Sequence, residues 1–517
     1  MISIADENTA KPPTLKEVFA GHPKGVYLIA VVEVWERFSF YGMRGLLVLF
    51  LTAAVMNGGF GWSPGQALRF YGAYISLVYV AAIVGGYLAD NFIGPRRSLV
   101  IGALLMSVGH FLMAGPVAFP WLIGQIYQEP VLSVLHSQSV MPLGGLSLSA
   151  EQMIMLQGVL ADAKAASGYD VSMAAASFGY LSMSYSFYAA TGLIILGTGF
   201  FKPSSYALLG RLYKDTDPRR ENGVFLFQIA VNFGAVTAGL VAGGIGETYG
   251  WHLGFTVAGV GMVIGTIIYM GFQNRYLGSI PHTPPAKIYK KQSTERIPLS
   301  DVEKNRLTVI ALMGLISALY WLAAEQYGGL LNLYAEGKTD RMVGAFEIPA
   351  TWFQSLNPFF IVALTPAAMI IWSGVGRHIT PPTKFAFGFV FTAVGFFLMA
   401  GAFQEAATSV DQRSSALWLV GAYLFVTLGE LCILSIGMNM VNSLAPLRML
   451  SSVLAFWFLC TALGNYGSGV VGAMTETLPD IVIFLGIAAA CLAAAAVLFV
   501  GARWWSRFVH ADEARTQ

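Results

Sequence analysis

Residues 33–44 read EVWERFSFYGMR and place four ionisable side chains between two apolar runs, GVYLIAVV at residues 25–32 and LLVLFLTAAV at residues 46–55. The combined stretch is long enough to cross a bilayer as a helix, which takes about 20 residues. Each ionised side chain in the middle of such a helix costs about 2.5 to 3.5 kcal/mol. These four side chains are therefore expected to face other protein or a water-filled cavity, and not lipid.

Helical geometry gathers these charges on one face. At 100° per residue, Trp35, Phe38 and Gly42 lie on the opposite side of the helix. The first helix is therefore expected to form one wall of a polar path. In an alternative interpretation, Glu33 and Arg37, spaced i and i+4, form an ion pair that only fixes helix packing. Six side chains share an arc of about 140°: Glu33, Glu36, Arg37, Phe40, Tyr41 and Arg44.

The composition of the whole chain is that of a membrane protein. Of its 517 residues, 56% are hydrophobic and 11% are charged, against about 25% charged in soluble proteins. Apolar runs recur along the chain and predict an all-α, polytopic membrane protein of two six-helix bundles, the major facilitator superfamily fold. The twelve predicted spans are 26–55, 66–90, 98–115, 183–210, 221–247, 253–273, 306–334, 355–373, 384–404, 415–443, 451–474 and 480–502.

Polar segments divide the chain. A Ser300/Glu303 capping box is expected to start the seventh helix. A second box, Ser149/Gln152, predicts a helix in the outer insertion that either acts as a lid or only covers the loops. The predicted parts are an N-terminal segment (1–25), a first bundle (26–273) with an outer insertion (116–180), a linker (274–305), a second bundle (306–503) and a tail (504–517).

The charge distribution predicts the orientation. With both chain ends inside, 22 of the 30 Lys and Arg residues fall in inner segments and five in outer loops, and positive charge near spans stays cytoplasmic. The N-terminus carries acidic residues and has no cleavable signal sequence. We therefore expect a bacterial inner-membrane protein with both termini in the cytoplasm. Lys287, Lys290 and Lys291 in the linker are read as a solvated connector in preference to a lipid contact.

Three further charges lie within predicted spans: Lys202, Glu325 and Glu430. Carboxylates and cations distributed over both halves suit a midplane site for a proton and a zwitterion. Burial raises the pKa of a carboxylate and a nearby cation lowers it, so the sequence leaves open which Glu titrates.

Several function classes find no support. Walker, G-x-S-x-G and H-E-x-x-H sequences are missing, so neither ATP hydrolysis nor an enzyme active site is expected. Cys432, Cys460 and Cys491 have no metal-ligand spacing and are read as packing residues. No cofactor, metal, nucleic acid or obligate protein partner is expected.

Five motifs together resemble the proton-dependent oligopeptide transporters, a branch of the major facilitator superfamily, and the resemblance covers nearly all of both halves. The first is E-x-x-E-R-F-x-x-Y-G at residues 33–42, which is specific to the family. The others are GGYLADNFIGPRR (85–97), FFKPSSYALLGRLY with DPRRENGVFLFQIAVNFG (200–213 and 217–234), WFQSLNP (352–358) and GELCILSIG (429–437).

The resemblance implies roles for matching residues. Glu33, Glu36 and Arg37 would form the proton-linked cluster with Lys202, and Glu325 would be a second proton site facing Arg44. Arg44 and Lys202 would receive the peptide carboxylate, and Glu430 with Asn232 and Asn357 the amino terminus. Tyr41, Tyr79 and Trp457 would line the pocket, while Asp90, Arg96 and Arg97 would be gating or structural residues. Asn232 and Asn357 could instead be interhelical hydrogen-bonding residues, and Tyr79 and Trp457 could be packing aromatics.

The chain departs from the family pattern at several points. A histidine that some relatives carry on the second helix is replaced by Gly72, and His110 is expected to be a packed or carbonyl-bonded residue. In the tenth-helix motif Ser435 is followed by Ile436 in place of Pro. The linker is too short and polar for the two extra spans of many bacterial relatives.

The resemblance implies a proton-coupled symporter that imports di- and tripeptides by alternating access, with peptides, protons and membrane lipid as its partners. One alternative is a relative that carries another small anion or metabolite, as nitrate carriers do, although those lack the intact E-x-x-E-R-F sequence. Another is a receptor that binds peptide without moving it. Only a flux measurement separates a receptor from a symporter.

Overall fold

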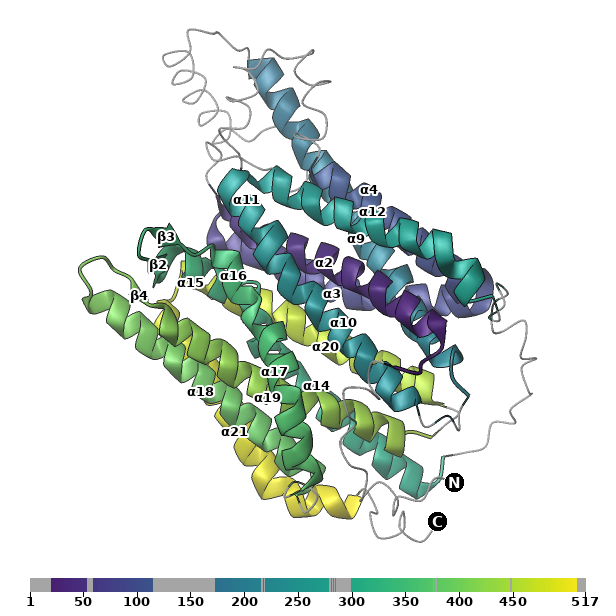
Figure 1. Ribbon diagram of the computed structural model, residues 1–517. Coiled ribbons are helices and arrows are strands. Elements are labelled where there is room, and N and C mark those ends of the chain that lie inside the picture. Colours follow the sequence, from purple (N-terminus) through teal and green to yellow (C-terminus); the bar gives the residue numbers. More distant parts are fainter. Residues whose placement is uncertain are drawn as a thin grey trace.

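The computed structural model describes residues 20–53, 59–114, 173–214, 217, 219–278, 280, 282, 284, 299–374, 376, 379–446 and 449–508. The predicted insertion helix at 149–166 and the linker lysines lie outside these residues. Nearly all described residues are helical, and the helices run side by side as an elongated bundle (Figure 1).

The first half of the bundle is built around α2. This helix packs against α10 and α12, while α4 packs on α9 and α12, and α3 packs on α9. The elements are α2 (Lys24–Thr52), α3 (Pro64–Leu88) with η3 (Ala89–Ile93), α4 (Pro95–Met113), α9 (Met173–Arg211), α10 (Arg220–Ala238), η4 (Gly239–Gly243), α11 (Gly244–Tyr249) and α12 (Trp251–Tyr276).

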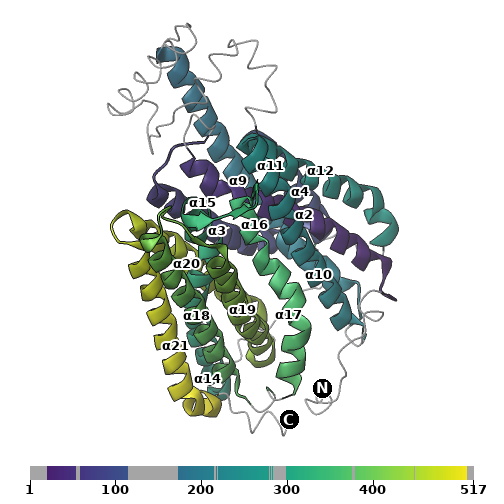
Figure 2. The same ribbon diagram turned by 60° about the vertical axis from the view of Figure 1, so that its left-hand side comes forward.

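The second half repeats this plan, with α18 packed on α19 and α21, and α14 on α20. Two short strand pairs, β1 with β4 and β2 with β3, lie together at one end (Figure 2). The elements are α14 (Asp301–Ala324), η5 (Glu325–Tyr327), α15 (Leu330–Lys338), β1 (Thr339–Asp340), β2 (Met342–Val343), β3 (Phe346–Glu347), α16 (Ala350–Gln354), α17 (Leu356–Ser373), α18 (Pro381–Thr408), β4 (Ser414–Ser415), α19 (Ala416–Leu444), α20 (Leu450–Gly472), η8 (Ala473–Glu476) and α21 (Asp480–Phe508).

The all-α membrane fold predicted from the sequence is confirmed. Among the described residues, ten helices are long and apolar enough to cross a membrane. The other two predicted spans correspond to α2, which carries the four charges, and α9, which are equally long and pack among the ten. Helix α9 begins at Met173 and so extends into residues that were assigned to the outer insertion.

The predicted start of the seventh helix is also confirmed. Ser300 Oγ accepts a hydrogen bond from the Glu303 amide at 3.2 Å, and Glu303 Oε2 accepts one from the Ser300 amide at 2.9 Å. This reciprocal pair satisfies two amides that a helix start leaves without partners. The three cysteines are buried and unbonded, as expected for packing residues.

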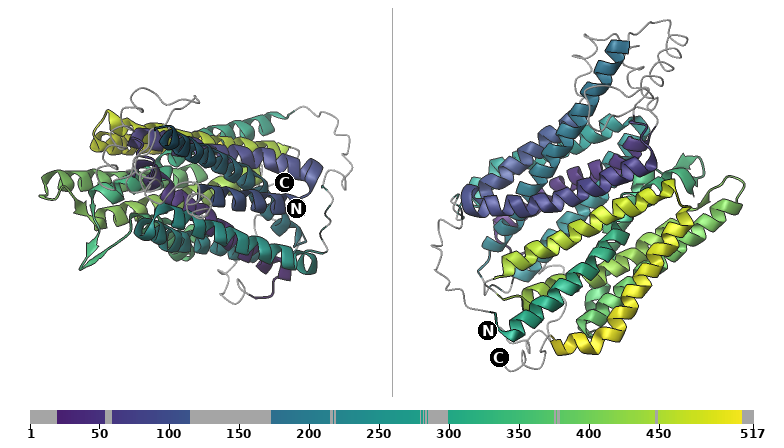
Figure 3. Two further views of the ribbon diagram at one scale, coloured as in Figure 1. Left: turned by 90° about the horizontal axis from the view of Figure 1, so that it is seen from above. Right: turned by 180° about the vertical axis from the view of Figure 1, so that it is seen from behind.

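Helix α2 begins and α21 ends at the same end of the bundle, which we call the lower end, as in Figure 1. The two halves meet along α3 and α20, which lie side by side when seen from behind (Figure 3). At this crossing a Cβ on Gly72 would lie 2.7 Å from the Gly469 Cα. The backbones therefore approach too closely for any side chain, which explains why this chain has no histidine there.

Candidate functional site

A cavity lies between the two halves, near the middle of the bundle, with a water-accessible volume of about 80 Å³. Helices α2, α3 and α9 form its first wall, and α14, η5, α17 and α19 form the second. Its lining residues are Arg37, Phe40, Tyr41, Arg44, Ile75, Val78, Tyr79, Thr198, Lys202, Trp321, Ala324, Glu325, Tyr327, Asn357 and Glu430.

The charged face of α2 turns inward, as predicted. Arg37 Nε lies 3.1 Å from Glu33 Oε1 and 2.5 Å from Glu36 Oε2, and all three side chains are at most 5% exposed. Two carboxylates around one guanidinium leave a net negative charge when both are ionised. Such a buried cluster is stable only if a proton or a further cation compensates it.

Lys202 on α9 is the nearest cation available for this purpose. Its ammonium lies 4.5 Å from the centre of the Tyr79 ring, a cation–π contact. Its charge interacts electrostatically with Arg37, Glu36 and Glu33. Among the described residues Lys202 makes no ion pair within 4 Å, so its charge remains available in the cavity.

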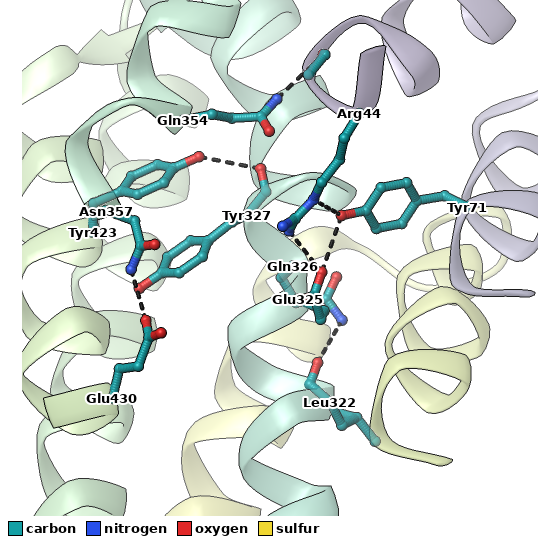
Figure 4. Close-up of polar contacts among 11 residues, drawn as sticks. Arg44, Tyr71, Leu322, Glu325, Gln326, Tyr327, Gln354, Asn357, Tyr423 and Glu430 are labelled. Carbon is teal, nitrogen blue, oxygen red and sulfur yellow. Dashed lines mark hydrogen bonds and ion pairs between the residues drawn. The ribbon is translucent and has the colours of Figure 1, made fainter. Parts of the chain in front are cut away.

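Arg44 and Glu325 join the two halves across the cavity (Figure 4). Arg44 Nη2 lies 2.6 Å from Glu325 Oε2, and Arg44 Nε donates to Tyr71 Oη at 2.7 Å. The Tyr71 hydroxyl in turn donates to Glu325 Oε2 at 3.1 Å. The guanidinium also lies over the Tyr41 ring, 5.4 Å from its centre. In this conformation Arg44 therefore faces Glu325, as predicted, and already carries a carboxylate partner.

Glu430 on α19 is held by neutral groups. Asn357 Nδ2 donates to Glu430 Oε2 at 2.8 Å and also approaches Thr427 Oγ1 at 3.0 Å. Tyr327 stacks on Tyr423 with ring centres 4.6 Å apart and supports this side of the cavity (Figure 4). No cation lies within 4 Å of Glu430 among the described residues. The second wall therefore offers a carboxylate without a salt-bridge partner.

Two predicted substrate residues lie elsewhere. Asn232 is 9% exposed, donates to the Gln228 carbonyl of its own helix at 2.9 Å and does not line the cavity. Trp457 is 4% exposed and packs against Gly437 in the second half. Asp90 lies exposed on η3 at the lower end, where Arg96 and Arg97 begin α4. The remaining predicted site residues line the cavity, except Glu33 and Glu36, which pair with the lining residue Arg37.

Sequence reasoning missed Tyr71 and Tyr327. Tyr71 completes the Arg44–Glu325 network, and Tyr327 lies two residues after Glu325 on η5. Tyr71, Ile75, Val78 and Tyr79 recur on α3 at helical spacing, which would have marked this face as the one that approaches α2. Tyr327 carried no comparable signal, because its neighbours in the sequence do not predict the change from α-helix to 3₁₀-helix at this point.

A polar latch closes the upper end of the bundle. Glu247 of the first half accepts hydrogen bonds from the Ala350 amide at 2.8 Å, the Thr351 amide at 2.7 Å and the Thr351 hydroxyl at 2.6 Å. It thereby caps the N-terminus of α16 in the second half, where a negative charge is favourable. Arg341 lies 3.8 Å from the same carboxylate.

Amides of the second half add to this closure. Asn332 Nδ2 and Gln354 Nε2 both donate to the Gly45 carbonyl of α2, at 2.9 and 3.2 Å. At the rim, Arg69 lies 3.3 Å from Glu476. The contacts described here between polar side chains of the two halves therefore lie either at the cavity or between the cavity and the upper end.

Comparisons with known proteins agree with this architecture. The model of the POT family matches residues 96–293 and 286–488. A peptide transporter of Yersinia enterocolitica is 30% identical over 93% of this chain and 94% of its own, and a di-/tripeptide transporter of Lactococcus lactis subsp. cremoris is 27% identical over 86% and 88%. A crystal structure of a peptide transporter, POT, in complex with sulfate superposes with a TM-score of 0.75 at 26% identity, covering 95% of this chain and 96% of that one.

Proposed function

The chain belongs to the POT family, and we propose that it is a proton-coupled symporter that imports di- and tripeptides by alternating access. A transporter, in preference to an enzyme, fits the family and its named relatives. One observation carries the proposal furthest. The cavity presents a lysine without an ion-pair partner on the first half, Lys202, and a carboxylate without a cationic partner on the second half, Glu430.

These opposite charges suit the two ends of a small peptide. The carboxylate of a peptide would bind Lys202, and its ammonium would bind Glu430 beside Asn357. Recognition of the backbone termini leaves the peptide side chains free to face the aromatic lining, Tyr41, Tyr79 and Trp321 among them. Because the two charges belong to different halves, a bound peptide would draw the halves together.

Coupling to protons follows from the Arg44–Glu325 pair. Opening the upper end separates this pair, and breaking a buried pair costs about 3 to 5 kcal/mol because both charges lose compensation. A proton on Glu325 removes one of these charges. The upper end can then open, and Arg44 is free to join Lys202 in binding the peptide carboxylate. Protonation and peptide binding are thereby linked through one guanidinium.

The cluster of Glu33, Glu36 and Arg37 provides a second proton site. A peptide carboxylate on Lys202 withdraws that positive charge from the two glutamates, whose ion-pair partner among the described residues is Arg37. Uptake of a proton by one glutamate restores the balance. Release of the peptide returns Lys202 to the cluster and favours release of the proton.

The charge bias of the sequence supports an orientation in the bacterial inner membrane. The lower end, where α2 begins and α21 ends, would face the cytoplasm, since 22 of the 30 Lys and Arg residues fall in the predicted inner segments. The latched upper end would then face outward. The described conformation is accordingly one in which the outer gate is closed.

Peptides with a blocked terminus are expected to compete poorly with dialanine for uptake. A hydrogen bond to a charged group contributes about 1.5 to 3 kcal/mol, so loss of either end should weaken competition roughly tenfold to 150-fold. The measurement is inhibition of labelled dialanine uptake by dialanine amide and by acetyl-dialanine. In Glu430→Gln, discrimination against acetyl-dialanine should shrink while discrimination against the amide persists. Equal inhibition by free and blocked peptides would contradict the assigned termini.

Glu247→Gln is expected to loosen the upper end. The glutamine loses the charge that accepts three hydrogen bonds, and charge-assisted bonds are about twice as strong as neutral ones. A loss of about 1.5 to 3 kcal/mol shifts the ratio of closed to open roughly tenfold to 150-fold. Electron–electron distances between spin labels at positions 249 and 343, both exposed at this end, would report the shift.

Glu347→Gln is the matched control for the latch, because Glu347 also pairs with Arg341, at 2.8 Å, but lies within the second half. Its distance distribution should match that of the parent chain. An unchanged distribution in Glu247→Gln would show that the latch does not hold the upper end closed.

A further inference from the structure

A groove of about 420 Å³ lies at the lower end of the first half, away from the central cavity. It is bounded by the start of α4, the end of α12 and the chain just beyond it. The proposed peptide and proton sites do not use it. Its lining residues are Arg96, Arg97, Val100, Ile101, Gln273 and His282.

Arg96 is buried in the wall of this groove, at 2% exposure. Its Nη1 donates to the carbonyls of Leu277 and Ile280 at 3.3 and 3.2 Å, and its Nη2 donates to Asn274 Oδ1 at 2.8 Å. These acceptors are neutral and belong to the last residues of α12 and the chain just after it, which explains how α4 is fixed to that helix. The Arg96 Nε is itself buried and has no hydrogen-bond partner among the described residues. A buried guanidinium without a carboxylate partner favours an anion close by.

Two more nitrogen-bearing side chains, Arg97 and His282, lie at the same place. Arg97 is exposed and makes no ion pair with any described residue. Partial burial and the charges of Arg96 and Arg97 hold the pKa of His282 below its usual value. Both arginines also lie in the first turn of α4, a 19-residue helix whose N-terminal end favours negative charge. The groove therefore combines three nitrogen-bearing side chains with a helix start.

An apolar track leads from this groove along the membrane-facing side of α4. Arg97, Ile101, Leu104 and Val108 follow at intervals of four, three and four residues and so share one helix face. The three apolar side chains are 38%, 49% and 52% exposed, and they lie within a helix long enough to cross the membrane. A ligand with an anionic headgroup and hydrocarbon tails matches both the basic groove and the apolar track.

We propose that this groove binds the phosphate headgroup of an anionic phospholipid, with Arg96 and Arg97 on the phosphate and the acyl chains along Ile101, Leu104 and Val108. The phosphate accepts from the exposed Arg97, the buried Arg96 adds its positive charge beside it, and the exposed His282 ring hydrogen-bonds to the headgroup. Basic pockets at the cytoplasmic side of membrane helices recognise anionic headgroups in this way. The lipid thereby braces α4 against α12 at the lower end, and this role is independent of the proposed peptide transport.

Native mass spectrometry of the purified full chain tests this site. The probes are phosphatidylglycerol, phosphatidylcholine with the same acyl chains, glycerol phosphate and inorganic phosphate. Phosphatidylglycerol should bind at least fivefold more tightly than the other three. One arginine near a membrane surface contributes about 1 kcal/mol to the binding of an anionic lipid. Arg97→Gln should therefore lower the affinity for phosphatidylglycerol about fivefold. Arg275→Gln is the matched control, because Arg275 lies exposed on α12 at the same end but outside the groove.

Three outcomes would overturn the site. Equal binding of phosphatidylcholine would mean that the groove does not recognise the charge of the headgroup. Equal binding of inorganic phosphate or glycerol phosphate would mean that the groove takes a free anion and needs no acyl chain. Unchanged phosphatidylglycerol affinity in Arg97→Gln, alongside the Arg275→Gln control, would place any bound lipid elsewhere. Because Arg97 makes no contact that stabilises the fold, its variant is expected to remain folded.

Discussion

Lys202→Ala is expected to abolish the accumulation of peptide driven by a proton gradient. In the proposed mechanism, Lys202 is the cation that both the glutamate cluster and a peptide carboxylate use; in the structure it lines the cavity and interacts electrostatically with Glu33 and Glu36. Without it the occupancy of the peptide site no longer changes the charge around Glu33 and Glu36. Peptide affinity should also fall roughly tenfold to 150-fold, since a hydrogen bond to a charged group is lost.

The measurement is uptake of labelled dialanine into proteoliposomes under an imposed inward proton gradient. Lys384→Ala provides the matched control, because Lys384 on α18 lies outside the cavity lining and packs over the Trp372 ring. The control should accumulate peptide as the parent chain does. Full accumulation by Lys202→Ala would remove this lysine from the coupling.

Glu325→Gln is expected to remove the pH dependence of the upper gate. In the proposed mechanism, protonation of Glu325 releases Arg44, so the upper end of the parent chain should open more often as the pH falls. Glutamine mimics the protonated side chain at every pH. Breaking a buried ion pair costs about 3 to 5 kcal/mol, and the variant avoids this cost. The open population at neutral pH should therefore rise by roughly a hundredfold or more, and gradient-driven accumulation of peptide should be lost.

Spin-label distances between positions 249 and 343, recorded across a pH series, would show the change. Glu476→Gln is the matched control, since Glu476 also pairs across the halves with Arg69 but lies at the exposed rim, where such pairs contribute at most about 1 kcal/mol. A gate that still opens with acid in Glu325→Gln would mean that another group senses the proton.

The sequence was sufficient to predict features that rest on local patterns. Apolar runs marked the helices, Ser300 and Glu303 marked a helix start, and the spacing of Glu33, Arg37 and Arg44 placed these side chains on the inner face of α2. In each case a costly buried charge or an unsatisfied amide restricts the fold to few solutions. These features could be read one helix at a time.

Features that depend on how helices meet could not be read in this way. Asn232 donates to a carbonyl of its own helix. The residue type alone does not predict whether an asparagine bonds its own helix or a ligand. The close approach at Gly72 depends on the opposing Gly469, which lies almost 400 residues away in the chain. The latch at Glu247 joins α11 of the first half to the start of α16 in the second half, a contact between helices that are about 100 residues apart in the chain.

The most direct test of the account is uptake of labelled dialanine into proteoliposomes that contain the purified chain, with and without an inward proton gradient and with nitrate as a competitor. We predict concentrative uptake only with the gradient, collapse of that uptake when an ionophore dissipates it, and no inhibition by nitrate. Uptake that merely equilibrates under every gradient, or no peptide flux at all, would contradict proton-coupled peptide symport.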